Sequence, residues 1–110
     1  MSKAPMIGQR RLRMVLEQPV ETADAIGGVS RSFAARTTLW VRMEPVSALE
    51  PAEAQRAEAM VTHRLTLRWR GDITAAMRFV ADGRIYAIHG QHDPDGRRRN
   101  LVVTVEEVQT

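Results

Sequence analysis

The stretch VTHRLTLRWRG, residues 61–71, alternates between apolar and polar side chains almost without a break. One side of the extended chain would carry His63, Leu65, Leu67 and Trp69; the other would carry Thr62, Arg64, Thr66, Arg68 and Arg70. A period of two is typical of a β-strand with one face in a core and the other in solvent. The stretch therefore predicts a half-buried strand, and the glycine at its end predicts where that strand stops.

The chain continues with two shorter alternating runs, at residues 77–81 and 84–89, which Asp82 and Gly83 join. Asp-Gly between two such runs is a strong signal for a β-hairpin, because a type I′ turn needs positive φ at both positions. A second turn is predicted by Asp-Pro-Asp-Gly at residues 93–96. The β-branched run at residues 100–108 then predicts a last strand.

The first half of the chain predicts two more strands. Residues 10–18 alternate, and we expect this strand to end at Pro19. Residues 21–32 contain two adjacent glycines and few large apolar side chains, so they predict a turn or loop. Residues 33–43 alternate again. Because six strands with polar outer faces need protected edges, the sequence predicts a mostly β fold, a small antiparallel six-stranded barrel or rolled sheet.

Residues 44–60 differ from the strands on both sides. Ser47 and Glu50 have the spacing of a capping box, and Pro51 would lie in the first helical turn. The alanine- and glutamate-rich residues that follow favour a helix, but alanine side chains offer little for contact with a core. We expect one long loop or short helix here, which either becomes ordered against another surface or lies on the barrel.

Length and composition limit the class of protein. A chain of 110 residues is one domain by size, so we expect residues 1–110 to form a single barrel domain. No apolar run approaches the about 20 residues of a membrane-spanning helix, and the N-terminus lacks the layout of a signal peptide. Without cysteine there is no thiol nucleophile and no thiolate metal site. We expect a cytoplasmic protein without membrane attachment and without a cofactor.

Side chains with catalytic or metal-binding chemistry are sparse. A three-histidine zinc site would need His63, His89 and His92 to converge. The aspartate pair at residues 93 and 95 is explained by turn chemistry, and the glycine pair lacks the lysine of a phosphate-binding loop. We therefore expect neither a metal site nor an enzyme.

The charges are arranged in separate segments, although the formal net charge is only +3. Arginines cluster at residues 10–13 and 97–99, and glutamates collect between residues 44 and 58. Opposite charges in separate segments suit head-to-tail contacts between identical subunits, while solvated faces explain any single cluster equally well. The arginines that could contact a DNA backbone or a neighbouring subunit are Arg64, Arg68, Arg70, Arg97, Arg98 and Arg99. Tyr86 is the candidate platform for stacking bases, because Trp69 and Phe79 fall on core faces.

The order of these features resembles the head–tail joining family (head-closure or stopper proteins) of tailed phages and phage-derived gene transfer particles. The resemblance covers nearly the whole chain and rests on TTLWVRMEPV at residues 37–46, THRLTLRWRGDI at 62–73 and MRFVADGRIYAIHG at 77–90. It implies a β-barrel that forms a homo-oligomeric ring, sixfold or twelvefold, below the portal and its adaptor. Such a ring would retain packaged double-stranded DNA, which passes through it non-specifically, and dock a tail terminator or other tail proteins.

The resemblance implies no active site, and it implies a place in a phage or phage-like particle assembled in the bacterial cytoplasm. It also implies that the long inter-strand segment faces the channel lumen or a neighbouring subunit. The residues in that position are Glu44, Glu50, Glu53, Arg56 and Glu58. Acidic walls would repel the DNA backbone and let it slide. The alternatives are a small DNA-binding β-barrel that acts alone, and a neighbouring connector part such as an adaptor or a tail terminator.

Overall fold

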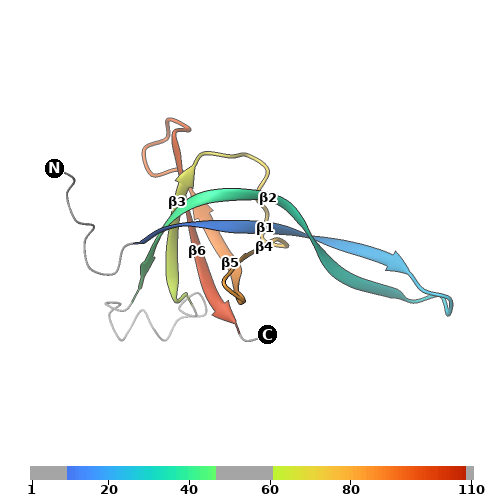
Figure 1. Ribbon diagram of the computed structural model, residues 1–110. Helices are drawn as coiled ribbons and strands as arrows, with labels where there is room; N and C mark the ends of the chain where they lie inside the picture. Colours follow the sequence, from blue (N-terminus) through green and yellow to red (C-terminus); the bar gives the residue numbers. More distant parts are fainter. Residues whose placement is uncertain (1–9, 47–60, 109–110) are drawn as a thin grey trace, which may run out of the picture.

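The structure, a computed structural model, describes residues 10–46 and 61–108 (Figure 1). Its strands are β1 (Arg10–Ala23), β2 (Val29–Pro45), β3 (His63–Arg68), β4 (Arg78–Ala81), β5 (Arg84–His92) and β6 (Asn100–Val108). They form a closed barrel in the order β1-β2-β3-β6-β5-β4, and each neighbouring pair is antiparallel. This confirms the predicted six-stranded antiparallel barrel. The described residues include no helix with the length and apolarity that a membrane crossing requires.

The barrel interior is filled by the apolar side chains of the alternating runs, and every strand contributes at least one of them. The largest side chains that are fully buried are Phe79, Met14, Leu16, Leu65, Val41, Val103 and Val105. Burial of one such side chain stabilises the fold by about 1.5–3 kcal/mol. The polar members of each run lie outside, and within the described ranges no polar or charged residue is buried. The period-two pattern thus becomes an inside and an outside of one barrel.

The predicted hairpin between β4 and β5 is confirmed. Asp82 and Gly83 have φ angles of 54° and 76°, and the strands pair up to Ala81↔Arg84 on either side of them. Both central residues are in the left-handed region that a type I′ turn requires. Glycine adopts this region without strain, which explains its place in the turn.

Two expectations for the first half of the chain are wrong. β1 does not end at Pro19, and residues 21–32 are not a loop, because β1 and β2 stay paired from Arg10↔Met43 to Ala23↔Val29. Only residues 24–28 form the turn between them. Proline is tolerated in β1 because β4 pairs with residues 15–17 alone. Beyond them β1 is an edge strand among the described residues, and edge strands are where proline is tolerated within a sheet.

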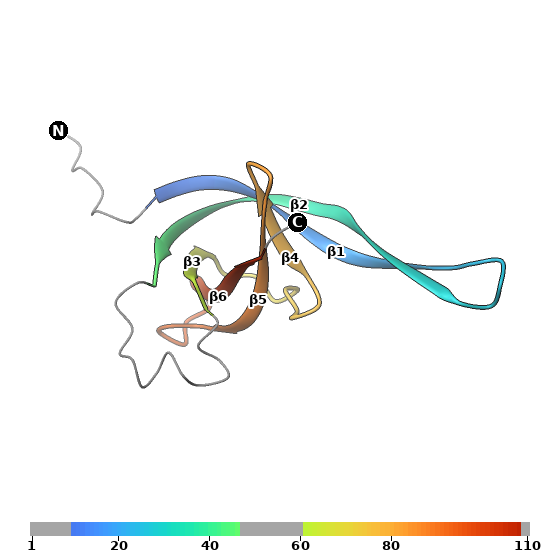
Figure 2. The ribbon, with the colours of Figure 1, turned by 90° about the horizontal axis from the view of Figure 1, so that it is seen from below.

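The distal part of this two-stranded ribbon, residues 18–34, is called the arm. Figures 1 and 2 show the arm projecting away from the barrel in both views. It accounts for the elongated dimensions of the molecule, 58 × 35 × 30 Å. Residues 20–32 are all exposed. Within the described part of the chain neither edge of the arm has a strand partner, because β3 pairs only with residues 41–45 of β2.

The long segment after β2 begins later than predicted. Glu44 and Pro45 belong to β2, where they pair with Arg64 and His63. Residues 47–60 lie outside the described residues, and with them Glu50, Glu53, Arg56 and Glu58. The expectation of a loop or short helix there stays a prediction.

Candidate assembly surfaces

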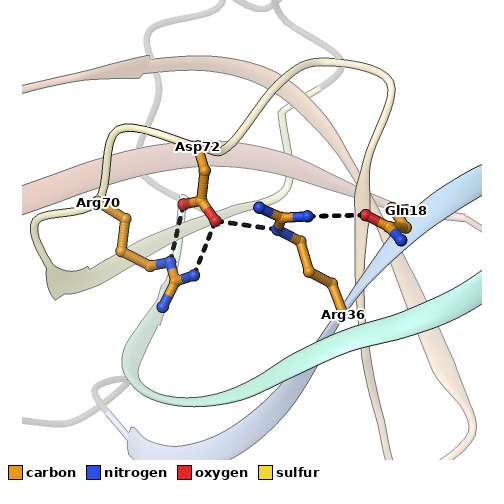
Figure 3. A network of polar contacts seen from close by, with 4 residues as sticks. All are labelled: Gln18, Arg36, Arg70 and Asp72. Atoms are coloured by element: carbon orange, nitrogen blue, oxygen red, sulfur yellow. Dashed lines mark hydrogen bonds and ion pairs between the residues drawn. The ribbon is translucent and has the colours of Figure 1, made fainter.

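A network of charged side chains joins the base of the arm to the segment that follows β3 (Figure 3). Arg70 donates from Nε to Oδ1 of Asp72 over 2.9 Å and from Nη2 to Oδ2 over 2.8 Å. Arg36 on β2 donates from Nε to Oδ2 of the same carboxylate over 2.9 Å. Its Nη1 donates to Oε1 of Gln18 on β1, also over 2.9 Å. One carboxylate thus connects both strands of the ribbon to the barrel.

The electrostatics of this network favour its charged form. The hydrogen bonds from Arg70 hold the pKa of Asp72 well below its ordinary value, and Arg36 lowers it further, while partial burial opposes both. The hydrogen bond to Asp72 in turn raises the pKa of Arg70. Bidentate pairing of a guanidinium with a carboxylate fixes orientation as well as distance. The network is therefore suited to hold the arm at a defined angle to the barrel.

A groove opens beside the network, where β2 and β3 separate. The pairing of the two strands ends at Val41↔Leu67, and beyond this point residues 38–40 face the chain that leaves β3. The groove has a volume of about 760 Å³. Its lining combines apolar side chains with basic ones, among them Leu39, Leu67, Trp40, Arg11, Arg42 and Arg68.

Trp40 is the most unusual residue of the groove, because 56% of it is exposed. The guanidinium carbons of Arg11 and Arg13 each lie 5.7 Å from the centre of its rings. The register places Arg13 opposite Trp40, and Arg11 lies two residues along the same face of β1. A cation above an aromatic face contributes about 0.5–1 kcal/mol at an exposed site. The tryptophan is thus an exposed aromatic surface with positive charge beside it.

The arginines predicted to form one stripe on β3 differ in their partners. Arg64 pairs with Glu44 over 3.2 Å, and Arg70 is held by Asp72. Arg68 is exposed and lines the groove, and the described residues include no acidic partner within ion-pair distance of it. Of the three, Arg68 is therefore the side chain most available to a ligand or a partner.

The other predicted arginines lie in the loop between β5 and β6. Oδ1 of Asp93 accepts the backbone N–H of Gly96 over 3.0 Å, and Oδ2 accepts that of Arg98 over 2.7 Å. Arg98, at φ 57°, places its guanidinium 5.4 Å from the ring centre of Trp69. Arg99 pairs with Asp95 over 2.8 Å. Arg97 is exposed. The loop therefore adds further positive charge near Trp69, itself part of the groove lining.

One predicted residue is misplaced, and several functional candidates were missed. Tyr86 is only 2% exposed and packs in the core, so its proposed role as a stacking platform is wrong; the exposed aromatic residue is Trp40. Arg36 and Asp72 were missed as partners because the chain gives no sign of a contact across 36 residues. The described ranges contain no cluster of three or more His, Cys, Asp or Glu residues that could hold a metal ion.

The fold defines the class of protein as a small closed antiparallel β-barrel, here with a projecting arm. The particular family follows from comparison: the chain matches the phage head completion protein family over residues 6–108, and it belongs to that family. It therefore has a role in phage head completion, as a component of a phage-type particle. A comparison with curated proteins gives no match.

Two solved structures are similar over almost their whole length. The first is the solution structure of protein SF1141 from Shigella flexneri 2a, with 29% identity, a TM-score of 0.68, and coverage of 94% of this chain and 96% of that one. The second is a chain in the virion of a native gene transfer agent particle, with 26% identity, a TM-score of 0.61, and coverage of 90% and 96%. The family match and the second of these structures confirm the resemblance to the head-joining family of phages and gene transfer particles.

Proposed function

We propose that the chain is a head-closure subunit that assembles as a ring between the portal and adaptor on one side and the tail on the other. The observation that carries the proposal is the family match over residues 6–108, supported by a similar chain in a gene transfer agent virion. In this role the ring retains packaged DNA and provides the surface on which the tail docks. The role is structural rather than catalytic.

The shape and surface chemistry of the chain support this role. The strands close into a small barrel, and the arm extends beyond it (Figure 1). The arm and the groove are different surfaces of one subunit, so a contact between the arm of one copy and the groove of another would be head-to-tail. Such contacts generate closed rings when the rotation between subunits closes.

The proposal is tested by removing the gene from a strain that produces the particles. We expect DNA-filled heads that lose their DNA, together with unattached tails, and restoration of complete particles when the wild-type chain is supplied. Electron microscopy and nuclease protection of the packaged DNA measure the two effects. Complete, DNA-retaining particles without the chain would contradict the proposal.

A finer part of the proposal concerns Glu50, Glu53 and Glu58, which we place toward the DNA channel. It rests on the sequence alone, since acidic side chains repel a DNA backbone and let it slide. Replacing the three with glutamine is expected to leave the ring intact and to change DNA retention or release. Unchanged release kinetics from particles that contain the variant would count against it.

A DNA-binding barrel that acts alone makes a different prediction. Purified protein would then bind DNA with an affinity that falls steeply with salt, because each neutralised phosphate releases counterions. We expect a head-closure subunit to enter particles whether or not the isolated chain binds DNA. Salt-dependent binding by the purified chain together with its absence from particles would favour the solo binder.

A further inference from the structure

The arm carries apolar side chains that no described part of the chain covers. Ile26 in its turn is 93% exposed, Val29 is 65% exposed and Val20 is 37% exposed. A two-stranded ribbon without a covered face is at best marginally stable in water. Its unpaired edges also offer backbone groups to another chain. Residues 20–29, called the tip below, therefore form a surface suited to contact with a second molecule.

The charge of the tip is opposite to that of the groove. The tip carries Glu21 and Asp24 and no basic side chain. Glu21 pairs with Arg31 just beyond the tip over 2.9 Å, so the carboxylate of Asp24 supplies the negative charge that no basic side chain among the described residues neutralises. The groove brings Arg11, Arg42 and Arg68 to an opening whose apolar part includes the half-buried Leu39 and the exposed Trp40. Both surfaces thus combine apolar side chains with charge, and the charges are of opposite sign. Complementarity of this kind selects the partner and its orientation.

We propose that the tip of one subunit docks in the groove of the next copy of the chain. This inference rests on the proposed ring and names the contact that would build it. Within one subunit the contact is prevented by geometry, because the arm points away from its own barrel in both views (Figures 1 and 2). Each subunit gives a tip and receives one, so the contact propagates from copy to copy until the ring closes.

The turn at the tip is closed by its own hydrogen bonds. Oδ1 of Asp24 accepts the backbone N–H groups of Ile26 over 2.9 Å and Gly28 over 2.8 Å. The backbone N–H of Asp24 donates to the carbonyl of Gly28 over 2.9 Å, and Gly27 has a φ of 82°, which favours glycine. These bonds present Ile26 on an ordered turn. An ordered turn loses less conformational entropy on binding than a flexible one.

The base of the arm contributes to the same contact from a distance. The Arg36–Asp72–Arg70 network (Figure 3) reaches the base of the arm through Arg36. It reaches the groove through Arg70, which is one of the groove's lining residues. A change in this network would alter the angle of the arm and the shape of the groove together. The network is therefore a positioning element for the contact rather than part of the contact surface.

The test uses cysteine cross-linking, for which the chain is well suited because it contains no cysteine. One variant combines Ile26→Cys at the tip with Thr38→Cys in the groove; both positions are exposed. The control combines Ile26→Cys with Ala75→Cys, which is exposed but does not line the groove. Particles from strains that produce each variant are treated with a short bismaleimide, and the products are separated on a denaturing gel.

We expect the tip–groove variant to give a ladder of dimers, trimers and larger products, because each subunit is linked at both its tip and its groove. Variants with Ile26→Cys alone or Thr38→Cys alone can give only dimers, and the control pair should give no ladder. Adding Trp40→Ala to the tip–groove variant should lower the yield of the ladder at least fivefold, with the barrel shown to be folded by circular dichroism.

Three results would overturn the inference while leaving the proposed function in place. In the first, the chain is present in particles but the tip–groove variant gives no ladder. In the second, the control pair gives a ladder of equal yield. In the third, Trp40→Ala does not change the yield of the ladder. Loss of DNA binding by Trp40→Ala with an unchanged ladder would assign the groove to DNA instead. Absence of the chain from particles would overturn the proposed function itself, and the ring contact with it.

Discussion

The barrel part and the arm part of the β1–β2 ribbon are made of the same two strands, yet they differ in what lies beneath them. In the barrel part the alternate side chains Met14, Leu16, Val41 and Met43 are buried. In the arm, residues 20–32 are all exposed, and the strands are held together by their backbone ladder. The comparison separates two causes that usually act together: hydrogen bonding sets which strands pair, and core burial sets how stable the pairing is.

The boundary between the two parts is marked in the backbone. The register of β1 and β2 shifts between Leu16 and Glu17, close to where pairing with β4 stops. A bulge of this kind bends a strand and increases its twist. The ribbon thus changes direction at the place where it leaves the barrel.

The largest expected effect comes from the barrel. Phe79 is fully buried, and Phe79→Ala should lower the free energy of unfolding by about 3–5 kcal/mol, through lost apolar contact and the cavity left behind. Urea denaturation followed by tryptophan fluorescence measures the loss. A decrease below about 1 kcal/mol would show that the barrel core is not the main source of stability.

An intermediate effect is expected at the Arg36–Asp72–Arg70 network. Asp72→Asn removes the charge that binds Arg70 and Arg36, and should lower the free energy of unfolding by about 1 kcal/mol, since these side chains are only partly exposed. Hydrogen exchange should also become faster at the base of the arm. The matched control is Glu21→Gln, which breaks the exposed pair with Arg31 and should have almost no effect. Equal losses of unfolding free energy in the two variants would contradict a special role for the Arg36–Asp72–Arg70 network.

The same network predicts that the stability of the folded chain depends on pH. The pKa of Asp72 is lowered in the folded chain, whereas an aspartate in an unfolded chain has a pKa of about 3.9. Its contribution to stability is therefore complete above the unfolded pKa and is lost as pH falls toward the folded one. The difference in urea midpoint between wild type and Asp72→Asn should shrink between pH 7 and pH 3. A difference in urea midpoint that stays constant over this pH range would exclude protonation of Asp72 as the cause.

The smallest effect is expected at the tip. Ile26→Ser should change the free energy of unfolding of the isolated chain by less than about 0.5 kcal/mol, because the side chain is exposed and has no core contact to lose. The measurement is the same urea titration that is used for Phe79→Ala. A loss of more than about 1 kcal/mol would mean that the tip supports the isolated fold, against the comparison drawn above.

The fold could be predicted wherever alternation and turn chemistry agree. The β4–β5 hairpin follows from Asp82 and Gly83, and β6 was predicted with its observed limits because apolar residues recur along it. The arm could not be predicted in this way. Its strands bury no face, so no period marks them, and backbone pairing leaves no trace in composition. Pro19 predicts the end of a strand from the sequence alone, because proline is tolerated within a strand only at an unpaired edge, and the barrel topology is what shows that edge.

The candidate surfaces were predicted only in part. The alternation predicts that Arg68 and Arg70 lie on the outer side of their strand, but their partners depend on register and on contacts between distant segments. Trp40 could not be recognised as a candidate from the sequence, because Arg11 and Arg13 come beside it only through the pairing of β1 with β2. Tyr86 was misassigned because apolar residues occur on both faces of residues 84–89. Short runs of this kind leave the inward face undecided.

The short pairing between β1 and β4 also bears on the order in which the barrel folds. This seam joins only residues 15–17 to residues 78–80, and its ion pair, Arg78 Nε to Glu17 Oε1 at 2.7 Å, links positions 61 residues apart. The β1–β2 and β4–β5 hairpins form between neighbouring segments, whereas this seam requires a long loop to close before it gains any contact. We therefore expect the sheet to form first as an open, curved ribbon, and the barrel to close last along its shortest seam, at the root of the arm.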